Sequence, residues 1–152
     1  METPGFVVWG IGYYLLPMDH VSPAIRSKIM AAVKSADTGP EMLIRRALHR
    51  LGYRYGLHRN DLPGKPDLVF RSRRKVVFVH GCFWHGHNCK KGRLPKTRIE
   101  FWTEKISKNR ARDRRSVREL RKYGWSSITI WQCQTRSQQK IVDKIVRFLE
   151  SR

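Results

Sequence analysis

The feature that most limits the fold is a cluster of metal-ligand side chains within eight consecutive positions: Cys82, His85, His87 and Cys89. The remaining cysteine, Cys133, lies far along the chain, after an expected strand. Three thiolates and one imidazole complete a tetrahedral zinc shell of the structural Cys₃His type. Such a site would tie the end of that strand to the cluster and fix the conformation of the loop. The spacing leaves open which of His85 and His87 is the ligand.

The cysteine count supports a metal site. Three is an odd number, so the cysteines cannot all pair in disulfides, and three are too few for a disulfide scaffold. The alternative is that the cysteines are simply buried and the histidines lie on the surface. One site that uses all three cysteines favours zinc over that alternative.

The charge of the chain predicts an anionic partner. The 152 residues fit one domain, and 40% apolar and 11% aromatic residues suffice for a folded core. Lys and Arg number 32 against 12 Asp and Glu, so the net charge is +20. A nucleic-acid backbone is the commonest partner for such a chain, and basic side chains would contact phosphates without reading base sequence. Charge alone does not separate an enzyme from a binding protein.

The first seventeen residues differ in composition from the rest, because they hold no Lys or Arg. They are apolar, but they lack a basic start and are broken by glycines and Pro17, which argues against a signal peptide or a membrane span. Two interpretations stay open for residues 1–17: a misassigned start, or an N-terminal strand or arm packed on the domain. Residues 18–152 are predicted to form a single domain. The expected location is the cytoplasm, with the nucleoid as the place of action on DNA.

Periodicity predicts a mixed α/β fold. A helix is expected after Gly39 and ending at Gly52, with apolar residues near one face: Leu43, Ala47, Leu48 and Leu51. Residues 67–70 and 75–80 read as a hairpin with a basic turn between its strands. The later elements are expected in this order: a loop over 81–97, one long or two shorter helices over 97–123, a strand over 126–131 and a helix over 137–149. This order predicts a mixed β-sheet with helices on its faces.

A second candidate site lies at the hairpin. Asp67 follows Pro63-Gly-Lys-Pro at the start of one strand, and Val79 and His80 end the partner strand. These groups can converge on a hard, oxygen-seeking cation such as Mg²⁺, as in a nuclease site. Pro-Asp before a strand is more often only a turn. Asp67 gains weight because only Asp61 and Glu100 are also acidic between residues 42 and 103.

A third signal is aromatic. Phe83 and Trp84 lie between the candidate metal ligands, and Trp102 lies among basic residues of the next helix. Such side chains can stack on bases or wedge between base pairs, although aromatic residues are more often part of a core. The core interpretation is preferred for three others: Phe101, Trp125 and Trp131.

Taken together, these motifs resemble the very-short-patch repair endonucleases, the Vsr family. The resemblance runs from about residue 27 to near the C terminus and rests on four segments: PGKPD (63–67), VHGCFWHGHNC (79–89), TRIEFWTEKISKNRARDRR (97–115) and WQC (131–133). It implies a restriction-endonuclease-like fold. It also implies an enzyme that nicks DNA on the 5′ side of the thymine in a T:G mismatch left by deamination of 5-methylcytosine.

The resemblance also implies roles for catalytic residues. Asp67 matches the metal-binding carboxylate, and the main-chain carbonyl of Val79 matches a second Mg²⁺ ligand. His85 matches the histidine that activates the attacking water. Glu41 and His80 match positions that hold metal-bound waters in the family.

Structural and DNA-contacting roles follow from the same resemblance. The family's zinc ligands match Cys82, His87, Cys89 and Cys133. Its aromatic wedge matches Phe83, Trp84 and Trp102, and Met30 matches a residue that enters from the other groove. The family further implies a monomer acting on mismatched duplex DNA, a methyltransferase in the same cell, and downstream repair proteins.

The chain departs from the family pattern in two places. Val79 stands where threonine is usual, which is a mild change if the ligand is the backbone carbonyl. Gly86 and Asn88 replace histidines of a four-histidine run, and the expected cost falls on loop stiffness.

Two alternatives to a mismatch-nicking enzyme remain. One is a related nuclease of a mobile or restriction system that cuts matched DNA, and the other is a zinc-stabilised DNA-binding module without catalysis. The joint presence of Asp67, His85 and Glu41 argues against the second alternative, because a pure binder needs none of them. The candidate wedge aromatics argue against the first.

Overall fold

The computed structural model describes residues 22, 24–25, 28, 31–32 and 36–151. Two sequence predictions lie outside the described residues: the nature of segment 1–17 and the DNA-contacting role of Met30. No helix in the described part of the chain is long and apolar enough to cross a membrane.

A four-stranded sheet forms the centre of the fold, in the order β1, β2, β3, β4. The strands are β1 (Gly56–Leu57), β2 (Leu68–Phe70), β3 (Lys75–His80) and β4 (Ser126–Trp131). The first three pair antiparallel, and β3 pairs parallel with β4. The predicted hairpin is confirmed as β2 and β3, joined by a turn of 3₁₀ helix at Arg71–Arg73. A parallel pair needs a long crossover, which the loop after β3 and helix α3 (Ile99–Lys122) supply.

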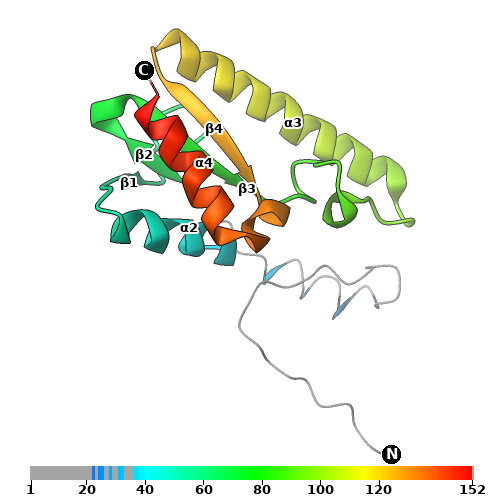
Figure 1. Ribbon diagram of the computed structural model, residues 1–152. Coiled ribbons are helices and arrows are strands. Elements are labelled where there is room, and N and C mark those ends of the chain that lie inside the picture. Colours follow the sequence, from blue (N-terminus) through cyan, green and yellow to red (C-terminus); the bar gives the residue numbers. More distant parts are fainter. Residues whose placement is uncertain (1–21, 23, 26–27, 29–30, 33–35, 152) are drawn as a thin grey trace, which may run out of the picture.

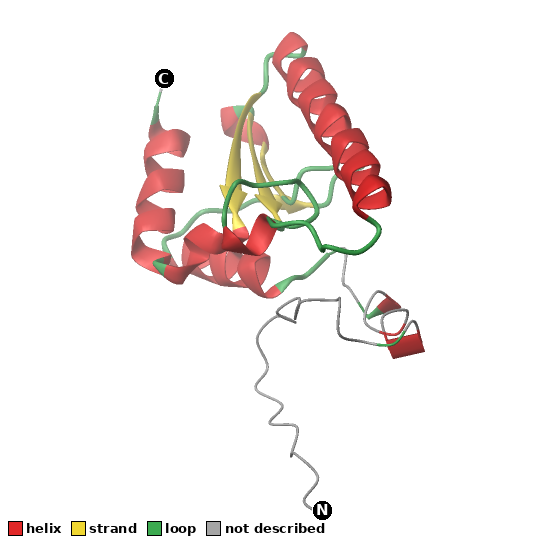
Figure 2. Ribbon diagram, turned by 90° about the vertical axis from the view of Figure 1, so that its right-hand side faces the viewer, coloured by secondary structure: helices red, strands yellow, loops and turns green. Residues whose placement is uncertain are grey.

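Helices cover both faces of the sheet, as Figures 1 and 2 show. Helices α2 (Gly39–Arg50) and α4 (Gln138–Glu150) pack on one face, against a buried cluster that includes Ile44, Leu68, Val77 and Ile145. Helix α3 packs on the other face, where its Leu120 joins a buried cluster with Val69, Val76 and Phe78 of the sheet. Alternate strand residues therefore point to opposite layers, as the strand period requires. The mixed sheet with helices on its faces is confirmed.

Two predictions about helix faces are wrong. Leu51 is 57% exposed, because it follows the last residue of α2, and Ile44 occupies the core instead. Phe101 is 42% exposed, whereas Trp102 is only 6% exposed. The buried face of α3 runs through Trp102, Ile106 and Leu120, and Phe101 is rotated by about 100° from that line. Residues 99–122 form one helix, which settles the choice between one helix and two.

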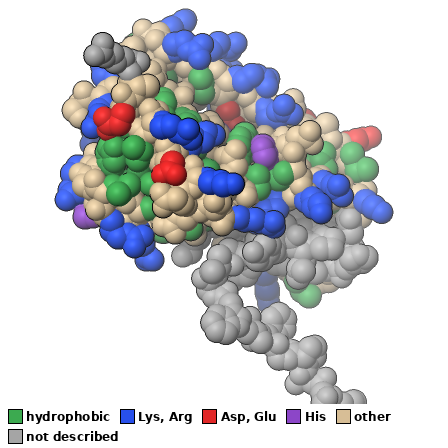
Figure 3. Space-filling view, in the orientation of Figure 1, with side chains coloured by type: hydrophobic (Ala, Val, Ile, Leu, Met, Phe, Trp, Pro, Cys, Tyr) green, Lys and Arg blue, Asp and Glu red, His purple; other side chains and the backbone are tan. Residues whose placement is uncertain are grey.

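The surface is strongly basic. On the face seen in Figure 3, Lys and Arg side chains lie over most of the molecule and Asp and Glu are few. Lys75 is an exception, because it is only 8% exposed. Its ammonium group donates to the carbonyls of Phe148 (2.8 Å) and Leu149 (3.2 Å), so it caps the end of α4 and ties that helix to β3.

Candidate active site and metal group

The first group of site residues lies where β2 begins and β3 ends. Because these strands are antiparallel, Asp67 just before β2 comes next to the last residues of β3. The N–H of Val79 donates to Asp67 Oδ2 at 2.6 Å. The structure thus brings the side chain of Asp67 to the backbone of Val79.

Asp67 is a perturbed carboxyl group. Burial raises the pKa of Asp67 to about 6, although the hydrogen bond from Val79 acts in the opposite direction. The nearby carboxylate of Glu41 also raises this pKa. A cation at this position would favour the ionised form, because it would relieve the cost of burying the charge.

Glu41 and His58 complete this group. Of the two, His58 was not predicted from the sequence. Glu41 is 2% exposed and lies in the first turn of α2. His58 Nε2 lies 3.0 Å from Glu41 Oε1, and its Nδ1 lies 3.9 Å from Asp67 Oδ1. The Nε2 atom is buried and makes no aligned hydrogen bond to any described residue. Arg45 lies 3.3 Å from the same Glu41 oxygen and pairs with Asp37.

The second group contains two stacked histidines and an aspartate. The rings of His80, at the end of β3, and His85, in the following loop, lie 3.7 Å apart and almost parallel. His85 Nδ1 lies 2.5 Å from Oδ2 of Asp113, which comes from α3. Asp113, like His58, was not predicted as a site residue. The available signal was that only Asp113 and Glu119 are acidic between residues 105 and 122.

The charges of this second group define the role of each ring. Burial, together with the charge of His85, lowers the pKa of His80 to about 4, so its ring is neutral at neutral pH. Burial acts to raise the pKa of Asp113, but the hydrogen bond to His85 and the nearby positive charges of His85, His80 and Arg112 together outweigh it and lower the pKa. An ionised carboxylate can only accept, so Nδ1 of His85 carries the proton and Nε2 is left to accept another.

Both groups meet along β3, because Val79 and His80 are consecutive residues. A cavity of about 640 Å³ opens beside the second group, between the end of the sheet and α3. His80, His85, His87, Asp113 and Trp131 are among its lining residues. His80 and His85 therefore border a space that a ligand can enter, whereas Asp67 and Glu41 are not among the residues that line it.

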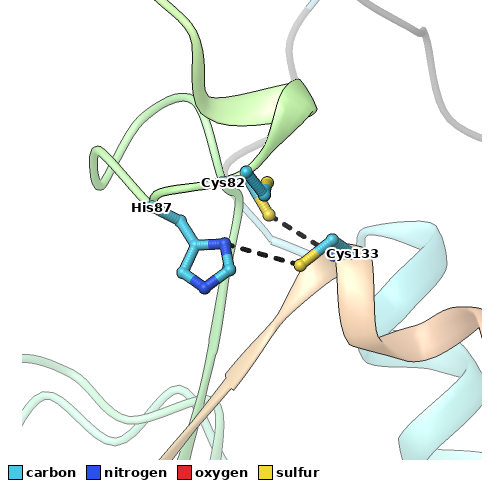
Figure 4. Close-up of side chains that lie close together, drawn as sticks. Cys82, His87 and Cys133 are labelled. Carbon is cyan, nitrogen blue, oxygen red and sulfur yellow. Dashed lines mark hydrogen bonds between the residues drawn. The ribbon is translucent and has the colours of Figure 1, made fainter.

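The third group is a cluster of metal-ligand side chains. Donor atoms of four residues lie within 4.8 Å of one another: Cys82, His87, Cys89 and Cys133. Figure 4 shows Cys82 and His87 of the loop pointing toward Cys133, which follows β4. Cys133 Sγ lies 3.4 Å from His87 Nδ1, and the N–H of Cys133 donates to Cys82 Sγ at 3.3 Å. The structure places His87, and not His85, with the cysteines.

Backbone hydrogen bonds shape the loop around these side chains. The N–H of His87 donates to the carbonyl of Cys82 at 2.9 Å, and that of Cys89 to the carbonyl of His87 at 2.8 Å. Gly92 closes the turn, where a Cβ atom would lie only 1.9 Å from the carbonyl oxygen of His87. Only glycine fits there, so the loop's tight path depends on it.

The donor set suits a metal ion. Burial raises the pKa of Cys82 to about 12 in the metal-free protein. Burial also acts to raise the pKa of Cys89, but hydrogen bonds with His87, Cys82 and the backbone of Lys91 and Gly92 together outweigh it and lower the pKa to about 7. A bound cation would hold all three thiols as thiolates, since metal binding displaces thiol protons.

The predicted wedge aromatics form one cluster. The ring of Phe83 lies 5.1 Å from that of Trp84 and 5.0 Å from that of Trp102. Phe83 and Trp102 are 4% and 6% exposed, and Trp84 is half-buried. Phe101 extends the cluster to the surface, with the Arg98 guanidinium 4.6 Å from its ring. The cluster thus has buried rings on its inner side and an exposed ring beside a basic side chain on its outer side.

Comparison with known proteins places the chain in a family. The model of the family described as DNA mismatch endonuclease Vsr matches residues 18–91. The type II nicking enzyme V.XorIIP of Xanthomonas oryzae pv. oryzae is 53% identical over 116 residues, which cover 76% of this chain and 85% of that protein. The DNA mismatch endonuclease Vsr of Escherichia coli is 42% identical over 121 residues, covering 80% and 78%. The type II nicking enzyme V.NmeAIP of Neisseria meningitidis is 40% identical over 124 residues, covering 82% and 89%. Because such similar relatives match over most of their length, the chain belongs to the Vsr family and is a DNA endonuclease.

Proposed function

We propose that this endonuclease nicks duplex DNA on the 5′ side of the thymine of a T:G mismatch, formed by deamination of 5-methylcytosine, in a Mg²⁺-dependent hydrolysis. The observation that carries the proposal is the assembly at the end of β3. There the half-buried Asp67 accepts a hydrogen bond from Val79, and His80, the next residue along the chain, stacks on a histidine held by Asp113. The Escherichia coli relative, whose name includes mismatch endonuclease, supports the mismatch as substrate.

Asp67 and the carbonyl of Val79 would hold the magnesium ion. Oxygen ligands suit Mg²⁺, and the raised pKa of Asp67 fits a carboxyl group that awaits a cation. The bound ion would supply Lewis-acid chemistry, drawing electron density from the scissile phosphate. Glu41 and His80 would hold ordered waters beside it.

His85 would act as the general base. Asp113 fixes the proton on Nδ1, so Nε2 keeps a free lone pair. That atom would take a proton from the water that attacks the phosphate, while the bond between phosphorus and the 3′ oxygen breaks and the leaving 3′ oxygen takes a proton from water. Asp113 would then stabilise the imidazolium that forms, as a carboxylate does beside other catalytic histidines.

Zinc would occupy the cysteine cluster as a structural ion. Three thiols and one imidazole with donor atoms within 4.8 Å are the donor set and the spacing of a closed tetrahedral site. Zinc bound by Cys82, His87, Cys89 and Cys133 would fasten the loop that carries His85 to the segment after β4.

The aromatic cluster would recognise the mismatch by wedging. A T:G pair is easier to unstack than a matched pair, so insertion costs less free energy there. Trp84 is the most exposed of the three candidate wedge residues, and its ring packs against the buried rings of Phe83 and Trp102. Met30 would enter from the other groove.

The proposal also covers the domain bounds, the fold, the oligomeric state, the cellular location and the partners. Residues 18–152 would form one endonuclease domain with a restriction-endonuclease-like fold, since the family match begins at residue 18 and the sheet carries helices on both faces. The enzyme would act as a monomer in the cytoplasm, on DNA of the nucleoid. It would work beside a cytosine methyltransferase, and downstream repair proteins would complete the repair.

Strand cleavage tests the proposal. A labelled duplex with one T:G mismatch and its matched control, each with a pool of flanking sequences, are incubated with Mg²⁺ and three proteins: wild type, Asp67→Ala and Asp143→Ala. Asp143 is an exposed carboxylate on α4 and serves as the control. The expected result is a nick 5′ to the mismatched thymine, lost only in Asp67→Ala. Cleavage of both duplexes would favour a matched-DNA nuclease, and binding without cleavage would contradict the proposal.

A further inference from the structure

A row of arginines on α3 borders the catalytic cavity. Arg110, Arg114 and Arg118 are spaced four residues apart, so they lie along one side of the helix. All three line the same cavity as His80, His85 and Asp113. Other basic residues of α3, such as Arg115 and Arg121, do not line it.

The row is not neutralised by neighbouring acids. Among the residues that the structure describes, no carboxylate forms an ion pair with Arg110, Arg114 or Arg118. Of the described residues that line the cavity, only Asp113 is acidic, and it is already held by His85 at 2.5 Å. Three guanidinium groups therefore face one engaged carboxylate, and the concave wall concentrates their positive potential.

Gly86 makes room for the first arginine. Its φ is +62°, and a Cβ atom there would lie 2.6 Å from Ile106 Cγ2 and 3.3 Å from Arg110 Cδ. A side chain at this position would clash with Ile106 and would also crowd the Arg110 side chain. Gly86, one of the two departures from the family's histidine run, thus has a structural consequence beyond the expected change in loop stiffness.

Two members of the row also line a second hollow. This hollow, of about 300 Å³, shares Gly86, Arg110 and Arg114 with the catalytic cavity and is also lined by Thr103 and Ser107. Two adjoining basic hollows suit an extended polyanion better than a single small anion. Guanidinium groups bind phosphate oxygens through two parallel hydrogen bonds, which fixes position as well as charge.

We infer that Arg110, Arg114 and Arg118 form a phosphate-binding row that seats the sugar-phosphate backbone of the DNA strand entering the catalytic cavity. The inference rests on the proposed function, because it assumes that this strand carries the scissile bond past His85. The row contacts phosphates only, so it positions the strand without reading bases.

Salt-dependent binding tests the row. Affinity for a mismatched and a matched duplex is measured without Mg²⁺, over a range of salt, for wild type, Arg110→Gln, Arg118→Gln and the control Arg115→Gln. Arg115 is exposed on the same helix and lines neither hollow, so its variant loses the same charge. Each row variant is expected to reduce the slope of log affinity against log salt by about one, equally on both duplexes. Slopes equal to that of Arg115→Gln would overturn the inference.

Gly86→Ala provides a second, independent test. It is expected to weaken DNA binding in the wild-type background and to have little further effect in Arg110→Gln, because both changes disturb the contact between Arg110 and a DNA phosphate. Fully additive losses would contradict the role of Gly86. Zinc content and melting temperature of each variant report folding. The two proposals can fail separately, because DNA binding is measured without Mg²⁺ and therefore without cleavage. If the enzyme did not nick mismatched DNA, the proposed function would be refuted, but the salt dependence of binding would still test the arginine row.

Discussion

Asp67, the proposed magnesium ligand, lowers the free energy of unfolding of the metal-free protein at neutral pH. Its carboxyl group is half-buried, and this burial raises the pKa to about 6 from an ordinary 3.8. Between pH 4 and 6 the folded chain keeps a proton that the unfolded chain loses, so the free energy of unfolding falls as pH rises through this window. The loss is complete above about pH 6 and absent below about pH 4.

Asp67→Asn is therefore expected to stabilise the magnesium-free protein at neutral pH. The amide stays neutral and its oxygen can still accept from the N–H of Val79. The variant should exceed wild type by up to about 3 kcal/mol at pH 7.5 and equal it at pH 4, as measured by urea unfolding. Added Mg²⁺ should narrow the gap by binding wild type only. A difference that stays constant between pH 4 and 7.5 would exclude a titrating Asp67.

Asp113→Asn tests the orienting role of the carboxylate beside His85. An amide keeps a similar shape but cannot stabilise the imidazolium, so the cleavage rate at saturating DNA should fall by about 10²- to 10⁴-fold. DNA affinity should stay close to that of wild type. Glu104→Gln, an exposed change on the same helix, is the control. A loss of affinity as large as the loss of rate would assign Asp113 to DNA binding instead.

The sequence predicted individual site residues where a motif held them, and missed them where only the fold does. Asp67 and Val79 were expected to converge because a hairpin joins their strands, and the structure brings them together. His58 belongs to no motif, and Asp113 reaches His85 only because α3 packs over the end of β3. Contacts made by packing leave no local pattern in the sequence.

Longer helices and strands were predicted from the sequence more accurately than short ones. Strand β4 has the predicted bounds, Ser126–Trp131, and α4 is displaced by one residue at each end from the expected 137–149. Strand β1 was missed because its two residues, Gly56–Leu57, carry no period. The exposed face of α3 was misjudged at Phe101, since one residue of helix rotation separates a core position from a surface one.

The link between the loop and β4 gives a prediction at this scale. Cys133→Ser should release one metal ion per chain and lower the melting temperature by about 10 °C, or roughly 3 kcal/mol for a chain of this size, because the loop loses its tie to the sheet. Metal analysis and thermal unfolding measure the two effects. Thr135→Ser, on the same turn and able to keep its hydrogen bond to Gln132, is the control. Unchanged metal content together with an unchanged melting temperature would refute the metal site.

At the scale of the whole molecule, layering and charge act together. Helix α3 covers one face of the sheet and carries both Asp113 and the arginine row to the cavity at the end of β3. The loop beside that cavity holds His85 and the metal-ligand cluster. One element therefore supplies the orienting carboxylate and the positive wall, while the net charge of +20 attracts DNA to the molecule.

The same charge predicts opposite effects of salt on stability and on binding. A chain of net charge +20 repels itself when folded, so salt from 50 to 300 mM should raise the melting temperature of the free protein by screening that repulsion. DNA affinity should fall steeply over the same range, because releasing the phosphates' condensed counterions into a saltier solution gains less free energy. The triple variant Arg110→Gln, Arg114→Gln, Arg118→Gln, with three fewer charges, should show smaller changes in both measurements. If salt lowered the melting temperature, the ion pairs between Arg and Asp or Glu would outweigh the repulsion, and the basic surface would stabilise the free fold as well as bind DNA.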